Sequence, residues 1–553
     1  MNKNKYLLLV SSLGVLVLLI AAAVQENVLK DWRRIQKSAR TEGGPIPVHL
    51  RQVVVPALKA ADRCVSCHVG MAPGEQGVIG PPVTAAHKPV VHDPADYGCT
   101  VCHAGQGRAT EKADAHGEVH FWPEPMIPLR YAYAGCGSCH THIRVPDRAT
   151  LGRGQKLVER YDCLACHRID GRGGTIRPGA AVAVEAPDLS RAGASGYDAG
   201  WYASHLQKHQ TAQTGAWRTS FAPIQDDDRR AIEVYLSSRV GAPELVEAKA
   251  LFHSLGCRGC HKVGGVGGDD GPDLTRVGEK DPGRIDFSAV PGAPTLANWF
   301  AEHFRSPAKV VPGSQMPALG LTEPQIDLLT FYMFSLRRSE YPESYWPKDR
   351  VRAERFGERE FSTDGPTLYA TFCAACHGPA GEGMRYPGMP AFPAVMNPDF
   401  LAVATDDFLR ASIHRGRPGR RMPAWGEKEG GLRPEEIDTL VKYLRRSGGG
   451  EPPATRPAEP RWVKADPADG RRLYDAYCAG CHGTRGQGAE GTALSNPVFL
   501  ATADDTYLVE TVSRGRRGTS MEGFSYSSPV HPALTRAEIE AIVAYIRTWE
   551  KTP

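Results

Sequence analysis

The chain opens with one long apolar run. From Tyr6 to Val24 this run is interrupted by only two serines and a glycine. That is about the 18 to 20 apolar residues that cross a bilayer, and more than the roughly 7 to 15 of a secretory signal core. We therefore expect residues 1–25 to form an uncleaved transmembrane anchor. Ala21-Ala22-Ala23 also offers a signal-peptide cleavage site, so a cleaved leader stays open as the alternative.

Charges around this run indicate which side of the membrane holds the remainder. Lys3 and Lys5 precede it and favour a cytoplasmic N-terminus, although Lys30, Arg33 and Arg34 on the other side weaken that signal. No second apolar run of this length follows. We expect a single N-terminal anchor in the cytoplasmic membrane and the bulk of the chain in the periplasm.

Four later segments carry apolar residues at i, i+3 and i+4, and each has an aromatic residue near its end. We expect amphipathic helices at residues 228–237, 323–336, 433–446 and 535–549. The chain also has 59 Gly and 44 Pro, and only 41% of its residues are hydrophobic. The predicted fold class is mainly α with much loop, and its modules need an apolar body other than side chains to pack around.

The charge balance excludes one class of partner. With 66 basic and 62 acidic side chains, the chain shows neither a nucleic-acid footprint nor a polybasic membrane patch. We expect no nucleic-acid partner.

All 14 cysteines fall in Cys-x-x-Cys-His motifs. Motifs 1 to 7 are, in chain order, Cys64/Cys67/His68, Cys99/Cys102/His103, Cys136/Cys139/His140, Cys163/Cys166/His167, Cys257/Cys260/His261, Cys373/Cys376/His377 and Cys478/Cys481/His482. This motif attaches haem c through two thioethers, and its His is the proximal iron ligand. Zinc ribbons and disulfide frameworks would not repeat a His after each Cys pair. We predict seven covalently bound haem c groups, numbered as their motifs.

Motif spacing divides the chain into two parts. Motifs 1 to 3 begin at residues 64, 99 and 136, too close for a domain each, so we predict one loop-rich triheme module at residues 26–148. Motifs 4 to 7 begin at 163, 257, 373 and 478, which fits one haem per domain. The predicted domains are 149–240, 241–340, 363–447 and 466–553, with a charged linker at 341–362 and a Pro/Gly-rich linker at 448–465. The composition of the second linker is typical of a tether on which the last domains move.

The four later domains resemble class I cytochrome c. Leu368-Tyr369-Ala370-Thr371-Phe372 before motif 6 matches Leu473-Tyr474-Asp475-Ala476-Tyr477 before motif 7, and both motifs continue into a Gly-rich loop. The resemblance covers residues 150–553. It implies four tandem domains in which a helix leads into each motif and a C-terminal helix crosses it.

A distal Met raises the reduction potential of such a haem, whereas a second His lowers it. Pro312-Gly313-Ser314-Gln315-Met316-Pro317 matches the Ser-x-Met-Pro element of class I cytochromes, so Met316 is the predicted distal ligand of haem 5. Met333 lies on the apolar face of the closing helix and is assigned to the core.

Met422 and Met521 are the predicted distal ligands of haems 6 and 7, with His531 as a rival of Met521. Met422 lies in Arg421-Met422-Pro423, whereas the other methionines of its domain come early in a Gly/Pro-rich loop. The residues given no ligand role are Met384, Met389 and Met396 and, as surface or helix residues, His253, His303 and His414.

Haem 4 departs from this pattern, because residues 149–240 contain no Met. Aligning Trp201–His205 with Trp299–His303 puts Phe221 or a neighbour where the Met would be. His209 is then the better distal ligand. A five-coordinate iron, open to a small molecule, is the other possibility.

Three distal ligands are needed in the triheme module, and its six non-motif histidines are His49, His87, His92, His116, His120 and His142. We expect three of His87, His92, His116 and His120 to ligate, with their pairing left open. Because bis-His coordination lowers the reduction potential of a haem, we expect this module to hold the low-potential haems of the chain.

A second resemblance concerns residues 98–117. Gly98-Cys99-Thr100-Val101-Cys102-His103-Ala104-Gly105-Gln106-Gly107, followed by Ala115-His116-Gly117, resembles multihaem cytochrome c subunits that accompany Rieske/cytochrome b-type quinol-oxidising complexes. This implies an electron-transfer subunit of a respiratory or photosynthetic complex, which passes electrons from quinol-oxidising integral membrane subunits to a soluble periplasmic carrier. The chain carries no cytochrome b bundle and no Rieske motif, so partners would supply them.

Two other functions stay open. A reductase or peroxidase would use an open haem 4 with His205, His209 and Arg218 over its distal face. The third hypothesis is a multihaem cytochrome that polymerises outside the cell to conduct electrons. The predicted membrane anchor argues against it.

Overall fold

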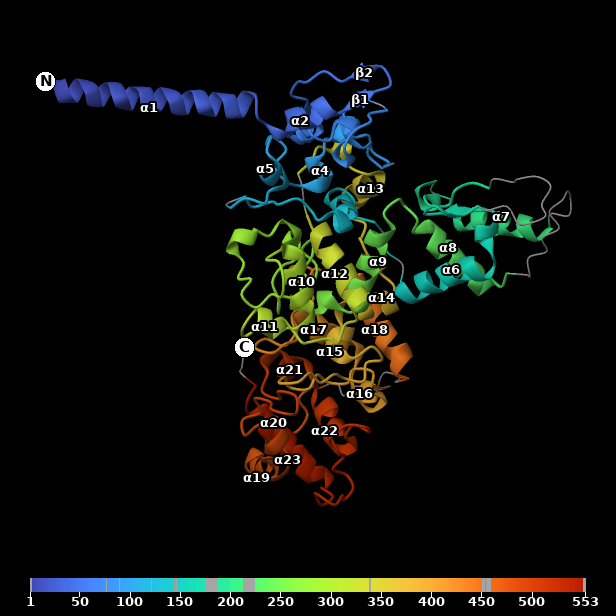
Figure 1. Ribbon diagram of the computed structural model, residues 1–553. Coiled ribbons are helices and arrows are strands. Elements are labelled where there is room, and N and C mark those ends of the chain that lie inside the picture. The colour runs from blue at the N-terminus through green and yellow to red at the C-terminus, as the bar shows by residue number, and fades with distance from the viewer. Residues whose placement is uncertain are drawn as a thin grey trace.

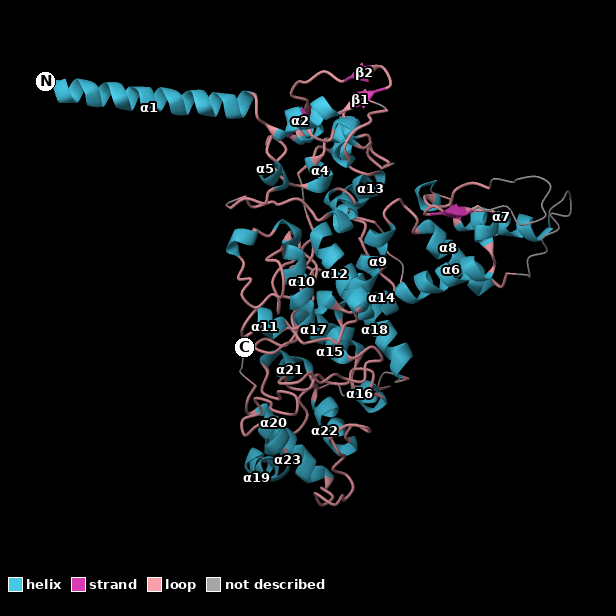
Figure 2. Cartoon of the chain, in the orientation of Figure 1, coloured by secondary structure: helices cyan, strands magenta, loops and turns pink. Residues whose placement is uncertain are grey.

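The computed structural model describes residues 2–550 except 76, 89, 121, 144, 146, 175–185, 196, 212–223, 338–339, 450–452 and 454–458. In this part, strands occur only as antiparallel pairs: β1 (Arg40–Thr41) with β2 (Gly44–Pro45), β3 (Val53–Val55) with β4 (Ala60–Asp62) and β5 (Arg168–Ile169) with β6 (Arg172–Gly173). The remaining regular structure is helical (Figure 2). The prediction of a mainly helical, loop-rich chain is confirmed.

The first helix, α1 (Asn2–Asn27), projects from the body with its apolar side chains exposed (Figure 1). Its most apolar stretch has a mean hydropathy of 2.8, and none of that stretch is buried. An exposed apolar helix of this kind is stable in a membrane, and a signal peptide of this kind is cleaved off. The helix therefore agrees both with an uncleaved anchor and with a cleaved signal. Lys30, just after the end of α1, pairs with Glu26 at 2.6 Å and with Glu111 at 2.8 Å. These ion pairs connect the C-terminal end of α1 to the triheme module.

The triheme module consists of short elements around a small core. Its helices are α2 (Asp31–Ser38), α3 (Pro94–Tyr97), α4 (Thr100–His103) and α5 (Lys112–His116), and a 3-10 segment spans Leu129–Ser138. The main apolar cluster that lies wholly within this module holds six buried residues: Val53, Val55, Leu58, Ala60, Val65 and Ala72. The buried carboxylate of Asp62 fixes motif 2 by accepting from the backbone N–H groups of Cys99 at 2.5 Å and Thr100 at 3.0 Å.

Each later motif follows an entry helix that packs against a closing helix. These pairs are α6 (Arg148–Arg160) with α8 (Asp226–Ser237), α9 (Pro243–Ser254) with α12 (Glu323–Ser335), α14 (Gly365–Phe372) with α18 (Pro434–Gly448) and α19 (Pro467–Tyr477) with α23 (Arg536–Arg547). Small residues allow the crossing: a Cβ at Gly154 or Gly470 would overlap the carbonyl oxygen of Ala231 or Ala541 on the closing helix. All four predicted closing helices are confirmed, with their ends within two residues of expectation.

Further helices occupy the loop side of these domains. They are α7 (Ala199–Thr211), α10 (Leu296–Arg305), α11 (Pro307–Val310), α13 (Lys348–Phe356), α15 (Ala374–His377), α16 (Pro398–Val403), α17 (Asp406–Arg415), α20 (Ala479–His482), α21 (Pro497–Thr502) and α22 (Asp505–Arg514).

The modules form a column with one lateral domain. In Figure 1 the triheme module, α9–α12, α14–α18 and α19–α23 follow one another down the column, while α6, α7 and α8 lie beside it. One apolar core extends from Ile127 to Phe334 and a second from Phe361 to Ile546. Motif 3 therefore shares a core with the domains of motifs 4 and 5, and the last two domains share another.

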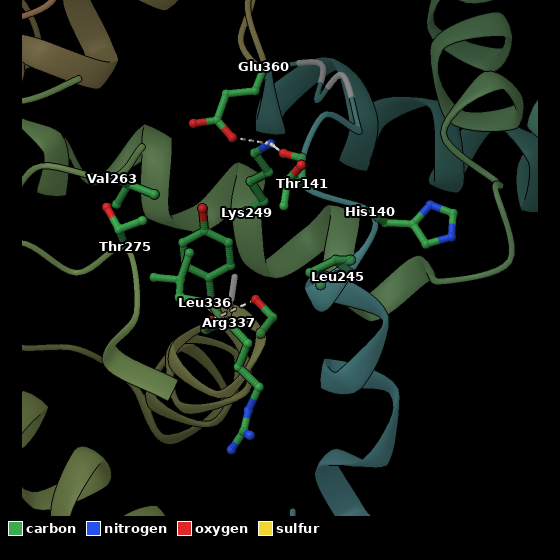
Figure 3. Close-up of a pocket in the computed structure, with 12 residues that line it drawn as sticks. His140, Thr141, Leu245, Lys249, Val263, Thr275, Leu336, Arg337 and Glu360 are labelled. Atoms are coloured by element: carbon green, nitrogen blue, oxygen red, sulfur yellow. Dashed lines mark hydrogen bonds and ion pairs between the residues drawn. The ribbon is translucent and has the colours of Figure 1, made fainter. Parts of the chain in front are cut away.

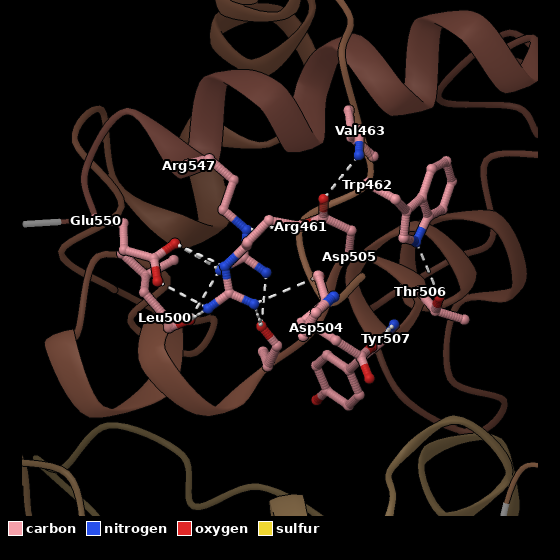
Figure 4. Close-up of polar contacts among 12 residues, drawn as sticks. Arg461, Trp462, Val463, Leu500, Asp504, Asp505, Thr506, Tyr507, Arg547 and Glu550 are labelled. Carbon is pink, nitrogen blue, oxygen red and sulfur yellow. Dashed lines mark hydrogen bonds and ion pairs between the residues drawn. The ribbon is translucent and has the colours of Figure 1, made fainter. Parts of the chain in front are cut away.

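The two predicted linkers are packed at their described ends. The first contains α13 and leads into Phe361, which is buried in the second core. At the end of the second, Arg461 donates to the carbonyl oxygens of Leu500 at 2.7 Å and Ala503 at 3.1 Å and pairs with Glu550 (Figure 4). The last two domains share one core, so the structure does not support movement of the last domain relative to the one before it.

Candidate haem-binding sites

All seven Cys-x-x-Cys-His motifs adopt the same local structure. In each, the backbone N–H of the His donates to the carbonyl oxygen of the first Cys at 2.9–3.0 Å. This helical turn brings both cysteines and the His together, as attachment to one porphyrin requires. No disulfide joins any of the 14 cysteines. Over the described ranges, no cluster of three or more His, Cys, Asp or Glu could hold a bare metal ion. The geometry thus fits haem and neither zinc nor a disulfide framework.

In motifs 4 and 7 the two predicted attachment cysteines differ in their apolar contacts. Cys163 and Cys478 pack against the two apolar cores, and burial raises the pKa of the Cys163 thiol to about 11 and that of Cys478 to about 12. Cys166 and Cys481 belong to neither core; Cys166 is half-buried, as Cys163 is, and Cys481 is exposed. The role of all four as thioether residues stays a prediction that rests on the motif.

The backbone nevertheless holds these two cysteines within their motif turns. The N–H of Cys166 donates to the carbonyl oxygen of Cys163 at 3.3 Å, and the N–H of Cys481 donates to that of Cys478 at 3.2 Å. The second Cys of each motif thus leaves the turn on a side that the apolar core does not cover. A porphyrin attached there would have one vinyl edge near the core and the other toward solvent.

Five of the motif histidines are oriented by a backbone carbonyl. Since a carbonyl only accepts, each Nδ1–H donates and Nε2 keeps its lone pair for a metal. The pairs are His68 with Val83 at 3.1 Å and, at 2.8 Å each, His167 with Pro187, His261 with Pro272, His377 with Pro393 and His482 with Thr492. These rings are held as proximal ligands need to be.

Two motif histidines of the triheme module each face a second histidine. The ring centroids of His87 and His103 lie 6.1 Å apart, and those of His92 and His140 lie 6.2 Å apart. Two imidazoles bound to one metal ion through bonds of about 2 Å have centroids roughly 6 Å apart. Both pairs therefore leave room for one iron between them.

The remaining motif histidine, His68, has His116 as its neighbour. Burial lowers the pKa of His68 first, and the nearby His116 lowers it further. His142 instead places its Nδ1 2.8 Å from the Thr141 hydroxyl. The ring distances thus favour His87 and His92 among the four predicted candidates. His116 is the third candidate through its electrostatic effect on His68, and His120 is left without an assigned iron.

The three predicted distal methionines lie in matching loops. The backbone N–H of Met316 donates to Ser314 Oγ at 3.2 Å, and that of Met521 donates to Thr519 Oγ1 at the same distance. The carbonyl oxygens of Met422 and Met521 accept from the N–H of Arg417 at 2.8 Å and of Arg516 at 2.7 Å. The shared geometry supports a shared role as distal ligands.

Competing side chains have other contacts. Met333 is buried in α12 as expected, Met396 is buried against Gly381, and the sulfur of Met389 accepts from Arg421 at 2.8 Å. The buried ring of His531 stacks on Phe524 with centroids 4.1 Å apart, and its Nε2 lies 3.2 Å from Glu522. These contacts favour Met521 over its rival.

The three histidines expected at the surface or in helices all lie in helices, His253 in α9, His303 in α10 and His414 in α17. His253 is 5% exposed, and burial lowers its pKa well below the usual value. His303 has a buried Nδ1, and burial followed by the neighbouring His261 lowers its pKa to about 4. His414 is exposed. His303 is therefore a second distal candidate beside Met316, which its i+4 spacing from Trp299 could have suggested.

The domain of motif 4 matches that of motif 5 in this helix. His205 stacks on Trp201 with centroids 4.6 Å apart, as His303 stacks on Trp299 at 5.0 Å. This supports the alignment made from sequence. Arg218, Phe221 and the side chain of His209 lie outside the described residues, so the distal ligand of haem 4 stays a prediction.

Several motifs that follow one another down the column are in contact. The N–H of Arg63, just before motif 1, donates to the carbonyl oxygen of Gly107, just after motif 2, at 2.7 Å. A Cβ added at Gly135, just before motif 3, would overlap the carbonyl oxygen of Cys102 in motif 2. Further down, a Cβ added at Gly256, just before motif 5, would lie 2.9 Å from the backbone nitrogen of Ala375 in motif 6, so these two motifs also lie against each other.

A buried ion cluster joins the triheme module, the motif 5 domain and the 341–362 linker beside motif 3. Lys249 and Arg258 both pair with the carboxylate of Glu360, and Lys249 also donates to the carbonyl oxygens of Thr141 at 3.1 Å and Ile143 at 3.2 Å. Burial alone would raise the pKa of Glu360, but the two cations hold it well below its usual value. In Figure 3, Lys249 and Glu360 line a pocket whose wall also includes His140 and Leu336.

The last two domains pack through equivalent residues, offset by 99 positions along the chain. Asn397 donates to the carbonyl oxygen of Arg517, and Asn496 donates to that of Pro418, both at 2.9 Å. Helix α16 packs on α22, and α17 packs on α21. The interface thus has approximate two-fold symmetry.

Aromatic rings and arginines extend this symmetry. The equivalent rings of Phe408 and Tyr507 stack with centroids 4.5 Å apart. Arg417 lies over Phe408 and Phe499, and its equivalent Arg516 lies over Tyr507 and Phe400. Because Arg417 and Arg516 also hold the methionine loops, the two predicted distal ligands are tied to one interface.

Profiles of known families match the later part of the chain. A cytochrome c profile matches residues 151–239, 245–337 and 467–550, and a profile for cytochrome c oxidase, cbb3-type, subunit III matches residues 362–444. These stretches contain motifs 4 to 7.

Curated relatives match over a smaller share. FixP, a cbb3-type cytochrome c oxidase subunit of Bradyrhizobium diazoefficiens, is 31% identical over 164 residues, 28% of this chain and 51% of that protein. CcoP, a cbb3-type cytochrome c oxidase subunit of Azospirillum sp., is 31% identical over 200 residues, 33% of this chain and 60% of that protein. The chain thus spans about half to three fifths of these relatives.

Among solved structures, a reducing HAO-like protein complex of Kuenenia stuttgartiensis aligns with 34% of this chain and 96% of its own at 17% identity. Its TM-score of 0.23 is too low to relate the two folds. The profiles and the curated relatives together show a multihaem c-type cytochrome with several cytochrome c domains, distantly related to CcoP and FixP.

Proposed function

We propose that this multihaem cytochrome is a membrane-anchored periplasmic heptahaem subunit that relays electrons from a quinol-oxidising membrane complex to soluble periplasmic acceptors. Bound haem iron supplies the redox chemistry by alternating between ferric and ferrous states. The residues of the chain attach each haem, hold its iron from both sides and bring neighbouring sites into contact. The observation that carries the proposal is this contact between motifs, through Arg63 with Gly107 at motifs 1 and 2 and through Gly256 against Ala375 at motifs 5 and 6.

The distal ligands support a direction for the flow. Histidines face the motif histidines in the triheme module, whereas methionines lie in the loops of the last domains. A His ligand lowers the potential and a Met ligand raises it. Electrons entering beside the membrane at the triheme module would therefore run toward the distant C-terminal end.

The relatives support partners in a membrane respiratory complex. The resemblance of residues 98–117 favours Rieske/cytochrome b-type subunits, and the match of residues 362–444 to a cbb3-type oxidase subunit favours an oxidase. Purification of the full chain in a mild detergent, with identification of what stays bound, distinguishes these partners. Recovery of neither kind of complex contradicts the partner assignment.

Haem content and potentials test the relay itself. Mass spectrometry of the holoprotein is expected to show seven haem additions. Potentiometric titration followed by optical and EPR spectra is expected to find the bis-His haems below the His/Met haems. Fewer haems, or bis-His haems at the high-potential end, would overturn the count or the direction.

A further inference from the structure

We propose that haem 4 is a side branch and that electrons pass directly between haem 3 and haem 5. This rests on the proposed relay and adds its wiring. Chain order would route electrons through all seven haems in series. The arrangement of the modules instead sets the order 1–2–3–5–6–7 along the column, with the domain of motif 4 attached laterally (Figure 1).

Motif 3 lies directly on the domain of motif 5. A Cβ added at Gly137, between the two cysteines of motif 3, would overlap the carbonyl oxygen of Ser335 at the end of α12. Just before the motif, Tyr131 stacks on Phe334 with centroids 5.5 Å apart and donates to Asp327 at 2.6 Å.

Just after motif 3, the contact continues into the buried ion cluster. Lys249 of α9 donates to the carbonyl oxygens of Thr141 and Ile143, and Glu360 of the 341–362 linker pairs with Lys249 (Figure 3). Motif 3 is thus enclosed by the entry and closing helices of the motif 5 domain. Below it, the close approach of Gly256 to Ala375 continues the column into motif 6.

The domain of motif 4 contacts the column by other surfaces. Its helix α6 touches α9 of the motif 5 domain. In the described residues, the contacts given for motif 4 are with its own α6 and β6, and they do not place it between motifs 3 and 5.

The direct step balances simply. One electron leaves the iron held by His140, which changes from ferrous to ferric, and enters the iron held by His261, which changes from ferric to ferrous. No bond forms or breaks, and no proton moves. Because tunnelling rates fall steeply with distance, the shorter of two routes carries the current.

A matched pair of variants tests the branch in the full-length holoprotein. Cys163→Ala/Cys166→Ala removes haem 4, and Cys257→Ala/Cys260→Ala removes haem 5. After rapid reduction of the triheme module, the first variant is expected to take up one electron fewer. Its His/Met haems should still be reduced at a rate within about twofold of the wild type, since distant changes couple weakly. The second should leave haems 6 and 7 oxidised.

Loss of onward reduction in the first variant would overturn the proposal. Since either variant can fail to fold, a cryo-EM structure of the wild-type holoprotein gives the second test. The edges of haems 3 and 5 are expected to lie closer together than those of haems 4 and 5, and the reverse order would also overturn it. A protein with seven haems but haem 4 in line refutes the branch alone, whereas a haem count below seven refutes the relay on which it rests.

Discussion

The triheme module and the C-terminal pair of domains carry the same attachment motif in different protein environments. The main apolar cluster of the triheme module has six buried residues, whereas the C-terminal pair shares a core of 31. The first module fixes its chain through polar contacts such as those of Asp62, and the second through packed helices such as α19 on α23. The difference indicates that haem is part of the core of the first module and an addition to an existing core in the second.

Withholding haem should separate the two regions most strongly. In a chain made without haem attachment, backbone amides of residues 26–148 are expected to exchange as in an unfolded chain, because their apolar cluster is too small. Amides of α14, α18, α19 and α23 should keep measurable protection. Hydrogen exchange with mass spectrometry measures both regions in one sample, and equal protection would break the comparison.

Removing one distal histidine should change the triheme module alone. His116→Ala is expected to convert one low-spin ferric haem to high spin, because it leaves the iron opposite His68 without its second ligand. His120→Ala is the matched control four residues away and should keep the low-spin spectrum. EPR of the oxidised holoproteins distinguishes them, and the opposite result would reassign the ligand.

Glu360→Gln should weaken the joint between the two regions. It leaves Lys249 and Arg258 buried without a counter-charge, which costs about 3 to 5 kcal/mol of unfolding free energy. Glu358→Gln is the control, since its ion pair with Arg352 is solvent-exposed and worth about 1 kcal/mol or less. Chemical denaturation of each holoprotein measures the difference.

The ion pairs of Glu360 with Lys249 and Arg258 also predict a pH dependence of stability. The folded pKa of Glu360 is depressed, so its contribution is present above the ordinary Glu pKa of about 4.3 and is lost as pH falls toward the depressed value. The gap between wild type and Glu360→Gln should therefore narrow in acid. A gap that widens in acid would contradict the ion-pair assignment.

The smallest expected effect lies at the interface of the C-terminal pair. Asp399 accepts from the backbone N–H of Arg517 at 2.8 Å and pairs with its guanidinium, which is largely exposed. Asp399→Asn should cost about 1 kcal/mol or less, because an exposed partner and the shared core limit the loss. Thermal unfolding measures it, and separation of the two domains would show that the ion pair matters more than the packing.

Local features were predictable from sequence. The four closing helices follow from apolar spacing, and Met333 followed from its place on the apolar face of one of them. The burial of His253 and His303 was not predictable in this way, because a polar residue on a helix is exposed or buried according to what packs over it. The packing of the last two domains was not predictable either, since composition indicates a linker between them, whereas the core that contains Phe408 and Tyr507 joins them in the structure.

The motif cysteines show the same limit. The Cys-x-x-Cys-His pattern treats both cysteines alike, yet Cys163 and Cys478 pack against an apolar core, whereas Cys166 and Cys481 do not, and Cys481 is exposed. Which thiol the protein covers depends on the helices that pack over the turn, and the pattern of the motif does not contain that information.

The sequence by itself determined the number of Cys-x-x-Cys-His motifs, and it predicted the proximal histidines and the division into a triheme module and four domains. Each of these follows from a few neighbouring residues or from their spacing along the chain. Only the tertiary structure decided which His faces which motif, that Glu360 pairs with Lys249 and Arg258, and that the domain of motif 4 lies beside the column. These depend on contacts between segments far apart in the chain, such as His92 with His140 and Gly137 with Ser335, and local pattern carries no information about which distant segments meet.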